Sequence, residues 1–138
     1  LAASIRTLQK IKSKKVIQKI WITGKQLKSF IELEIKKNKL EKYIGISGYP
    51  PWTILNFKNF NDKIDSWYLK TFFIISMANN GVLINSTNNI SFAIKQKHYL
   101  KICKAYKKTF FEIKKITINK KIDKIVMGNK VKPVFNVR

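Results

Sequence analysis

The side chains most often used as nucleophiles and metal ligands are scarce in this chain of 138 residues. It has one histidine, His98, and one cysteine, Cys103. A disulfide framework and a multi-cysteine or multi-histidine metal centre are therefore excluded. His98 adjoins Lys97 in a basic helical segment, which predicts a solvent-exposed imidazole. Cys103 lies on the apolar side of the same segment, where we expect a small core residue.

The carboxylates and lysines do not form a catalytic set by their spacing. Glu32 and Glu34 are two residues apart and do not share a helix face, and no pair of acids resembles an acid–base dyad. A buried lysine can form a Schiff base, but the 27 lysines lie almost entirely in polar runs. Lys70 is the least exposed by pattern, and we expect its ammonium to reach solvent. Phosphate-binding glycine loops and the nucleophile-elbow motif are absent. The sequence assigns no catalytic residue, cofactor ligand or metal ligand.

The formal net charge is +22, from 29 basic and 7 acidic residues, and it favours polyanions as partners. Only Arg6 and Arg138 are arginines, the residue type that reads bases, so a specific nucleic-acid reader is not expected. Lysine, isoleucine and asparagine make up 61 of the 138 residues, and A/T-rich codons explain all three. The alternative is a free-standing basic module that binds nucleic acid or anionic surfaces. It requires lysines from several elements on one face, with Tyr49, Trp52 or Tyr68 exposed there.

No segment is predicted to enter a membrane. The longest stretch without a charged residue, Thr71–Ile94, has a polar middle from Asn79 to Asn89. A spanning helix needs about 20 predominantly apolar residues. The first residues lack the apolar core of a secretory signal. We therefore expect a soluble, cytoplasmic protein.

Apolar periodicity predicts four helices and short strands between them. The helices cover Leu1–Lys12, Lys15–Asn38, a segment from Asp65 or Ser66 to Asn79, and Gln96–Ile116. The strands are Tyr43–Ser47, Trp52–Phe57, Val82–Ile84 and an extended piece Ile90–Ala93, with a polar loop at Asn85–Asn89. A helical or turn segment to Met127, a stop at Gly128 and a stretch Val131–Val137 complete the chain. This order predicts an α+β fold with a small antiparallel or mixed sheet covered by helices.

Two glycines have positions that indicate a role. Gly24 lies on the apolar stripe of the second helix, where it is either tolerated or marks the close approach of a neighbouring element. Gly81 follows the third helix, where the chain usually turns left-handed.

Several segments together resemble the C-terminal region of class III pyridoxal-phosphate-dependent aminotransferases, in the branch similar to glutamate-1-semialdehyde aminomutase. The clearest has a helix that ends at a Gly-Val turn, then a short strand, a polar loop and an -SFA- piece. Gly24 also matches a glycine in the corresponding family helix. The matching blocks are LAASIRTL (Leu1–Leu8), VIQKIWITGKQL (Val16–Leu27), SGYPPWTILNF (Ser47–Phe57), KTFFIISMANNGVLINSTNNISFA (Lys70–Ala93) and KPVFNVR (Lys132–Arg138).

The resemblance implies the C-terminal part of a fold-type I enzyme that transfers an amino group to a keto or aldehyde substrate and is a homodimer at full length. Residues 1–42 would join the large and small domains, and residues 43–138 would be the α+β C-terminal small domain. In the family, the Schiff-base lysine and most contacts to pyridoxal 5′-phosphate lie upstream of the matching region. The chain alone is then expected to be inactive and to pack against the large domain of the same longer chain. Trp52–Phe57 and Val82–Ile84 would share one sheet beside the helix that contains Phe72.

The same resemblance places the polar loop near the substrate, where neutral hydrogen bonds would hold a small amino or keto compound. The alternative is a solvated turn. The segment Asn85–Ala93 contains no arginine, so the carboxylate clamp of other branches is not expected. Asn136 stands where the family ending has an arginine, so a contact made by that arginine is not expected here. The candidate substrate-proximal residues are Ser86, Asn88, Asn89 and Ser91.

Overall fold

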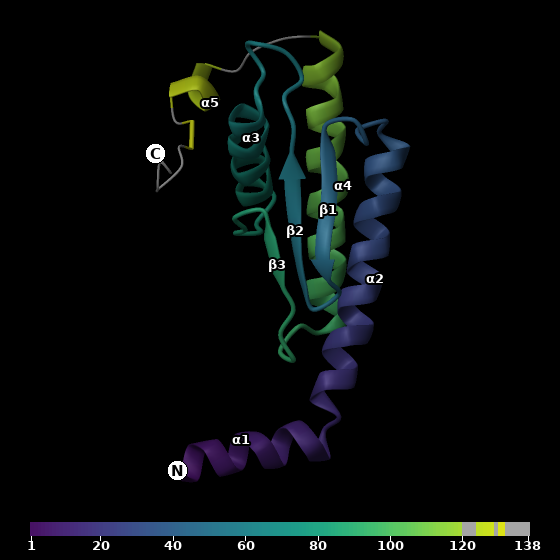
Figure 1. Cartoon of the computed structure of the whole chain (residues 1–138), viewed down its shortest axis with the longest axis vertical. Coiled ribbons are helices and arrows are strands. Elements are labelled where there is room, and N and C mark those ends of the chain that lie inside the picture. The colour runs from purple at the N-terminus through teal and green to yellow at the C-terminus, as the bar shows by residue number, and fades with distance from the viewer. Residues whose placement is uncertain (120–123, 129, 132–138) are drawn as a thin grey trace.

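The computed structural model confirms an α+β fold with a small antiparallel sheet (Figure 1). It describes residues 1–119, 124–128 and 130–131. In this part of the chain, no helix has both the length and the apolar character needed to cross a bilayer. The elements are α1 (Ala2–Ser13), α2 (Val16–Lys37), β1 (Ile44–Tyr49), β2 (Trp52–Phe57), α3 (Ser66–Asn79), β3 (Thr87–Asn89), α4 (Gln96–Asn119) and α5 (Lys124–Gly128).

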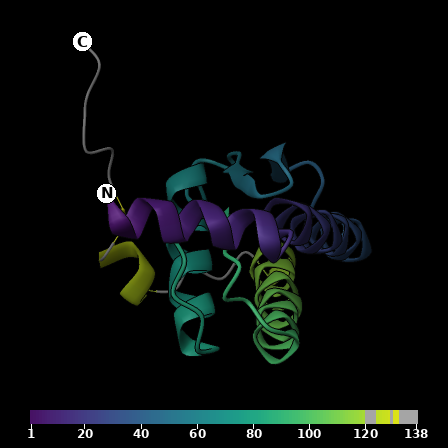
Figure 2. The same cartoon turned by 90° about the horizontal axis from the view of Figure 1, so that it is seen from below.

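The sheet has the order β1-β2-β3, with β2 in the centre and both pairings antiparallel. A tight turn through the two prolines joins β1 to β2, and Tyr49 pairs with Trp52 across it. Seen from below, α3 and α4 lie on one side of the strands (Figure 2). Thr53 and Leu55 are buried on that side, whereas Trp52 and Ile54 are exposed on the other. Alternation along β2 thus gives the sheet one covered face and one open face.

The core is built from the inner sheet face, α3, α4 and the second half of α2. Rings of Phe73, Tyr106 and Phe110 pack against one another at its centre. Leu27, Ile31 and Ile35 of α2 belong to the same buried cluster. The predicted apolar stripe of α2 is therefore confirmed from Gly24 onward. Whether a domain boundary follows residue 42 stays a prediction.

The apolar side of the N-terminal helix is hardly packed against the rest of the chain. α1 has no buried residue and projects away from the body at its lower end (Figure 1). Leu8 is 66% exposed, and on the first half of α2 Ile17 and Trp21 are exposed as well. Isolated helices of about a dozen residues are marginal in water. The exposed apolar side of α1 is therefore a surface that lacks a partner within the described residues.

The predicted strand Val82–Ile84 is wrong. This run forms no strand, and Leu83 in its middle is 93% exposed. The third strand lies instead in the segment predicted as a polar loop, at Thr87–Asn89, and Ile54 of β2 pairs with Thr87. Buried hydrogen bonds of Asn88 outweigh the β propensity of the apolar run, because they hold the later segment against β2.

Several local predictions are confirmed. The Cys103 side chain is buried, and burial raises the pKa of its thiol. His98 is exposed, and its Nδ1 accepts a hydrogen bond from the Lys95 N–H. Gly81 has a φ of 75°, the left-handed conformation expected after a helix. The predicted stretch Val131–Val137 and the block Lys132–Arg138 lie outside the described residues, apart from Val131.

We expect Asp65→Ala to lower the free energy of unfolding by about 1 kcal/mol at neutral pH. The Asp65 carboxylate caps α3 by accepting a bond from the Tyr68 N–H at 2.7 Å, and it also pairs with Lys130. Burial opposes ionisation, but Lys130 and the Tyr68 N–H together hold the pKa of Asp65 below its ordinary 3.8. The stabilisation is therefore present above about pH 4 and is lost as the pH falls through the lowered pKa.

Urea denaturation at pH 7 and below pH 3 measures this effect. Asp62→Ala, in the exposed loop before α3, is the control and should change little. An equal loss for the two variants, or a loss at Asp65 that persists in acid, would contradict the capping role.

Candidate functional site

The open face of the sheet carries an aromatic cluster at the β1–β2 turn. Tyr49 is 75% exposed and Trp52 is 61% exposed. The Trp21 ring of α2 lies 6.3 Å from the Tyr49 ring, measured between centroids. Gly24 of α2 faces the Pro50 carbonyl so closely that a Cβ there would lie 2.1 Å from the oxygen. Because Gly24 has no side chain, the hairpin turn can pack directly against α2. This packing places Tyr49, which pairs with Trp52, beside Trp21.

The covered face holds a buried polar chain that the sequence analysis did not find. The Tyr106 hydroxyl donates to Asn88 Oδ1 at 2.8 Å, and Asn88 Nδ2 donates to Thr53 Oγ1 at 3.1 Å. All three residues are buried, and burial raises the pKa of Tyr106, which keeps its hydroxyl protonated as a donor. The chain ties α4, β3 and β2 together. The amide of Asn88 is thereby engaged within the protein.

We expect Tyr106→Phe to lower the free energy of unfolding by about 1–3 kcal/mol, because it leaves Asn88 Oδ1 buried without this donor. The measurement is urea denaturation followed by circular dichroism. Tyr49→Phe removes the same hydroxyl at an exposed position and should change stability by less than about 0.5 kcal/mol. Equal stability of Tyr106→Phe and the unmodified chain would show that this bond does not hold β3.

A second polar contact joins α3 and α4. Ser76 Oγ donates to Glu112 Oε2 at 2.6 Å, so Thr109 Oγ1, 2.8 Å away, donates to Ser76. Ser76 and Thr109 are buried. A serine in the middle of the apolar run of α3 was the signal for this contact in the sequence. The Ser76 hydroxyl is engaged with both Thr109 and Glu112, so the contact holds the two helices together and leaves no free hydroxyl for a ligand.

The structure separates the four candidate substrate-proximal residues. Ser86 is buried at a φ of 54°, and it lines a hollow of about 240 Å³ beside α3 together with Trp67 and Lys70. Asn88 points into the core, whereas Asn89 is exposed and pairs with Trp52 in the sheet. Ser91 lines a different pocket. The four residues share a short segment, but they do not converge on one cavity.

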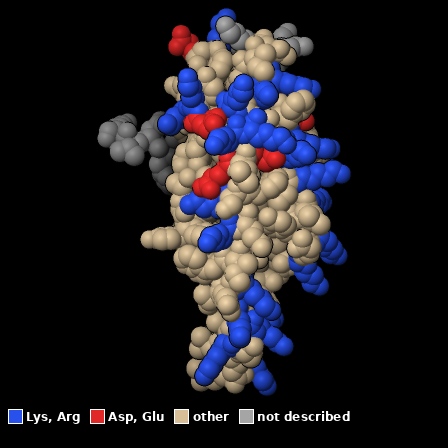
Figure 3. All heavy atoms as spheres, turned by 90° about the vertical axis from the view of Figure 1, so that its right-hand side faces the viewer, with Lys and Arg blue, Asp and Glu red and all other residues tan. Residues whose placement is uncertain are grey.

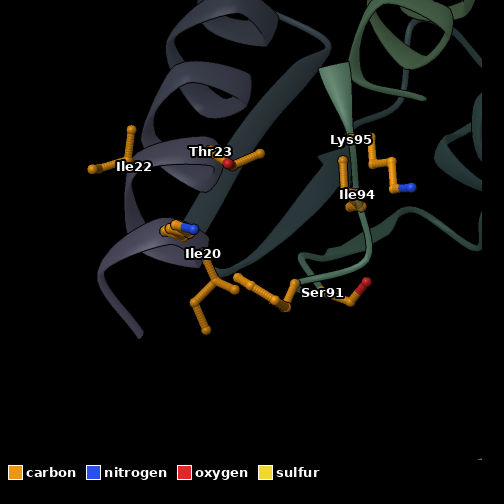
Figure 4. A pocket seen from close by; sticks show the side chains of 8 residues that line it. Ile20, Ile22, Thr23, Ser91, Ile94 and Lys95 are labelled. Atoms are coloured by element: carbon orange, nitrogen blue, oxygen red, sulfur yellow. The ribbon is translucent and has the colours of Figure 1, made fainter. Parts of the chain in front are cut away.

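The pocket at Ser91 has a volume of about 410 Å³ (Figure 4). It lies between the first half of α2 and the segment before α4. Lys19 Nζ is 5.2 Å from the centroid of the Phe92 ring, which places a cation over an aromatic face. Two ammonium groups, two hydroxyls and apolar walls can accommodate a small polar or anionic compound. The lining residues are Lys19, Ile20, Ile22, Thr23, Ser91, Phe92, Ile94 and Lys95.

The described residues do not by themselves form an enclosed site for a Schiff-base cofactor or a metal. No lysine in residues 1–119 is buried, and Lys70 lies half-exposed with its Nζ 5.4 Å from the Trp67 ring centroid. Groups of three metal-ligating side chains are not found in residues 1–119, 124–128 and 130–131. What these residues offer is an open aromatic face and shallow polar pockets.

The alternative of a free-standing basic module expected exposed aromatic side chains, and the three named for it differ in their exposure. Tyr49 and Trp52 are exposed, as it requires, but Tyr68 is fully buried.

Comparison with known proteins gives a likeness in fold. No protein-family model matches the sequence, and no curated protein does. Among solved structures, the chain is similar to the PLP (pyridoxal 5′-phosphate) internal aldimine form of the FumI protein of Sphingopyxis sp. MTA144. The TM-score is 0.70 at 17% sequence identity, over 85% of this chain. The match covers only 27% of the FumI chain.

Proposed function

We propose that this chain is the C-terminal small domain of a class III pyridoxal-phosphate-dependent aminotransferase or aminomutase within a longer protein. The observation that carries the proposal is the fold likeness, which covers 85% of the chain and only 27% of a PLP-binding protein. The ordered sequence blocks that resemble this family support it independently. The whole protein would transfer an amino group to a small keto or aldehyde substrate, with the cofactor bound mainly by the part that precedes this chain.

The unpartnered apolar surface supports the same proposal. α1, the first half of α2 and the open sheet face expose Leu8, Ile17, Trp21, Tyr49 and Trp52. Contiguous exposed apolar surface marks an interaction site. We propose that the large domain of the same longer chain covers it, and that the full-length protein is a homodimer. Amide hydrogen exchange in α1 should then be slower in the longer protein than in the isolated 138-residue chain.

The decisive experiment is to read and express the coding sequence upstream of the Leu1 codon. We expect an in-frame large domain, and the longer protein should bind pyridoxal phosphate on a single lysine of that domain. Borohydride reduction followed by peptide mass spectrometry locates the lysine. A start codon adjoining Leu1, or stoichiometric labelling of one lysine in the 138-residue chain, would overturn the proposal.

The placement of the substrate is tested in the longer protein. The segment that carries Ser86, Asn88, Asn89 and Ser91 is proposed to lie on the substrate side. Ser86 and Asn88 are buried, so Asn89 and Ser91 would contact the substrate. Asn89→Ala and Ser91→Ala should raise KM for the amino acceptor. Ser29→Ala, on an exposed position of α2, is the control. Unchanged KM in both test variants would remove this segment from the substrate mouth.

A further inference from the structure

The exposed side of α4 carries a row of uncompensated positive charge. Lys101, Lys104, Lys108 and Lys115 recur at helical spacing and are all exposed. The ion pair of Lys130 with Asp65 is the only one within the described residues, so none of the four has a carboxylate at contact distance. Like charges at these spacings repel one another and destabilise a helix. This repulsion acts among Lys101, Lys104 and Lys108, whereas Glu112 lies four residues after Lys108 and three before Lys115; an anion along the first part of the row would relieve it.

Neighbouring elements extend this row into a surface. Two hollows flank α4, of about 380 Å³ and 320 Å³, and Lys104 and Lys108 line both. The larger adds Lys37 of α2 and Lys107, and the smaller adds Lys101 with the asparagines that end α3. Figure 3, which faces the side of the molecule where α2 lies, shows basic side chains spread over it, with acidic ones in its upper half. We define the α4 lysine surface as Lys37, Lys101, Lys104, Lys107, Lys108 and Lys115.

The acidic groups near this surface are mostly used elsewhere. Glu34 lines the larger hollow but is only 8% exposed. Glu112 accepts its hydrogen bond from Ser76 on the inner side of α4. The hollows thus present five lysines against one largely buried carboxylate. The aromatic residue of this surface is Phe111, which is 51% exposed, with Lys115 Nζ 4.5 Å from its ring centroid.

We infer that the α4 lysine surface binds the phosphate backbone of single-stranded nucleic acid without reading its bases. Lysine is a point-charge partner for phosphate and lacks the fork that reads base edges. From Lys101 to Lys115 the row is about 21 Å long, at 1.5 Å per residue, so it can contact several successive phosphates of one strand. The exposed ring of Phe111, beside Lys115, can stack on a base. This inference is independent of the proposed enzymatic function.

The test is the affinity of the 138-residue chain for a fluorescein-labelled eight-nucleotide oligouridine, followed by anisotropy at several salt concentrations. The triple variant Lys104→Gln/Lys107→Gln/Lys108→Gln removes three charges from the surface. If each lysine neutralises one phosphate, the slope of log K against log salt falls by about 2, and affinity falls about 100-fold at 0.1 M salt. Relief of repulsion predicts a melting temperature no lower than that of the unmodified chain.

The matched control is Lys10→Gln/Lys12→Gln/Lys14→Gln, which removes the same charge from α1 and its end. It should weaken binding less than about threefold if α1 makes no phosphate contact. Equal losses in both triple variants would show attraction by net charge alone and would overturn the inference. Tighter binding of a DNA duplex, of inorganic polyphosphate of equal charge or of anionic lipid vesicles would overturn the assignment to single-stranded nucleic acid.

Discussion

Truncation of Phe73 to alanine should lower the free energy of unfolding by about 3–5 kcal/mol. The Phe73 ring is completely buried at the centre of an aromatic cluster. Its centroid lies 5.5 Å from the Phe57 ring, 5.8 Å from Tyr106 and 6.4 Å from Phe110. These neighbours come from β2 and α4, so the cavity left by the missing ring cannot collapse without moving the sheet against the helices.

Urea denaturation followed by tryptophan fluorescence measures the loss. Phe111→Ala is the matched control, since the same truncation at a half-exposed position should cost less than about 1 kcal/mol. If Phe73→Ala does not fold, Phe73→Leu keeps the test open and should still lose more stability than Phe111→Ala. A loss at Phe73 no larger than at Phe111 would mean that α3 does not pack on the sheet in this way.

Gly24→Ala should destabilise the protein by about 2–3 kcal/mol, although alanine is the better helix former. A Cβ at Gly24 would lie 2.1 Å from the Pro50 oxygen and 2.9 Å from the Pro51 nitrogen. Those are backbone atoms of a turn stiffened by two prolines, so they cannot yield as a flexible side chain does. Either α2 or the hairpin must move, and the contact between Trp21 and Tyr49 is then lost.

Gly45→Ala is the control for this substitution, because a Cβ there meets nothing within 4 Å. Its stability should stay the same or rise slightly, as expected when a glycine is replaced in a strand. Thermal unfolding of the two variants side by side separates them. If Gly24→Ala gains stability like a surface helix position, then α2 and the hairpin turn are not in contact in solution.

The exposed apolar surface around the contact between α2 and the hairpin turn is relevant to the proposed function. Trp21 contacts Tyr49, which pairs with Trp52, and the helix that precedes α2, α1, has no buried residue of its own. Such a helix gains stability from tertiary packing more than from propensity. A large domain that covers both features would account for their exposure in the isolated chain.

Local sequence signals predicted much of the fold. The apolar stripe of α2, the cap at Asp65, the left-handed Gly81 and the buried Cys103 all follow from the types of residues within a few positions. Helical periodicity and capping are local properties, so a single sequence carries them. The α+β class followed from the order of these elements.

The third strand and the candidate site depended on tertiary contacts. Val82–Ile84 has the composition of a strand, but Asn88 lies opposite Thr53 and beneath Tyr106, and its buried hydrogen bonds place the strand at Thr87–Asn89. Tyr106 is 18 residues away along the chain, and no pattern in the intervening segment signals that bond. Because the sequence does not show which of these side chains is buried, it predicted one polar group of four residues: Ser86, Asn88, Asn89 and Ser91.

Spacing along the chain thus specified which segments would be helical and roughly where they would start and stop, since those choices depend on neighbouring residues; α4 runs on to Asn119, past the predicted end at Ile116. It did not specify the direction in which each polar side chain of the short third strand would point. In an extended segment, successive side chains alternate between two faces. The pairing of β3 with β2 and the hydrogen bond to Tyr106 of α4 orient Asn88 toward the core, so Asn89 faces outward. This orientation is determined only when the sheet is assembled.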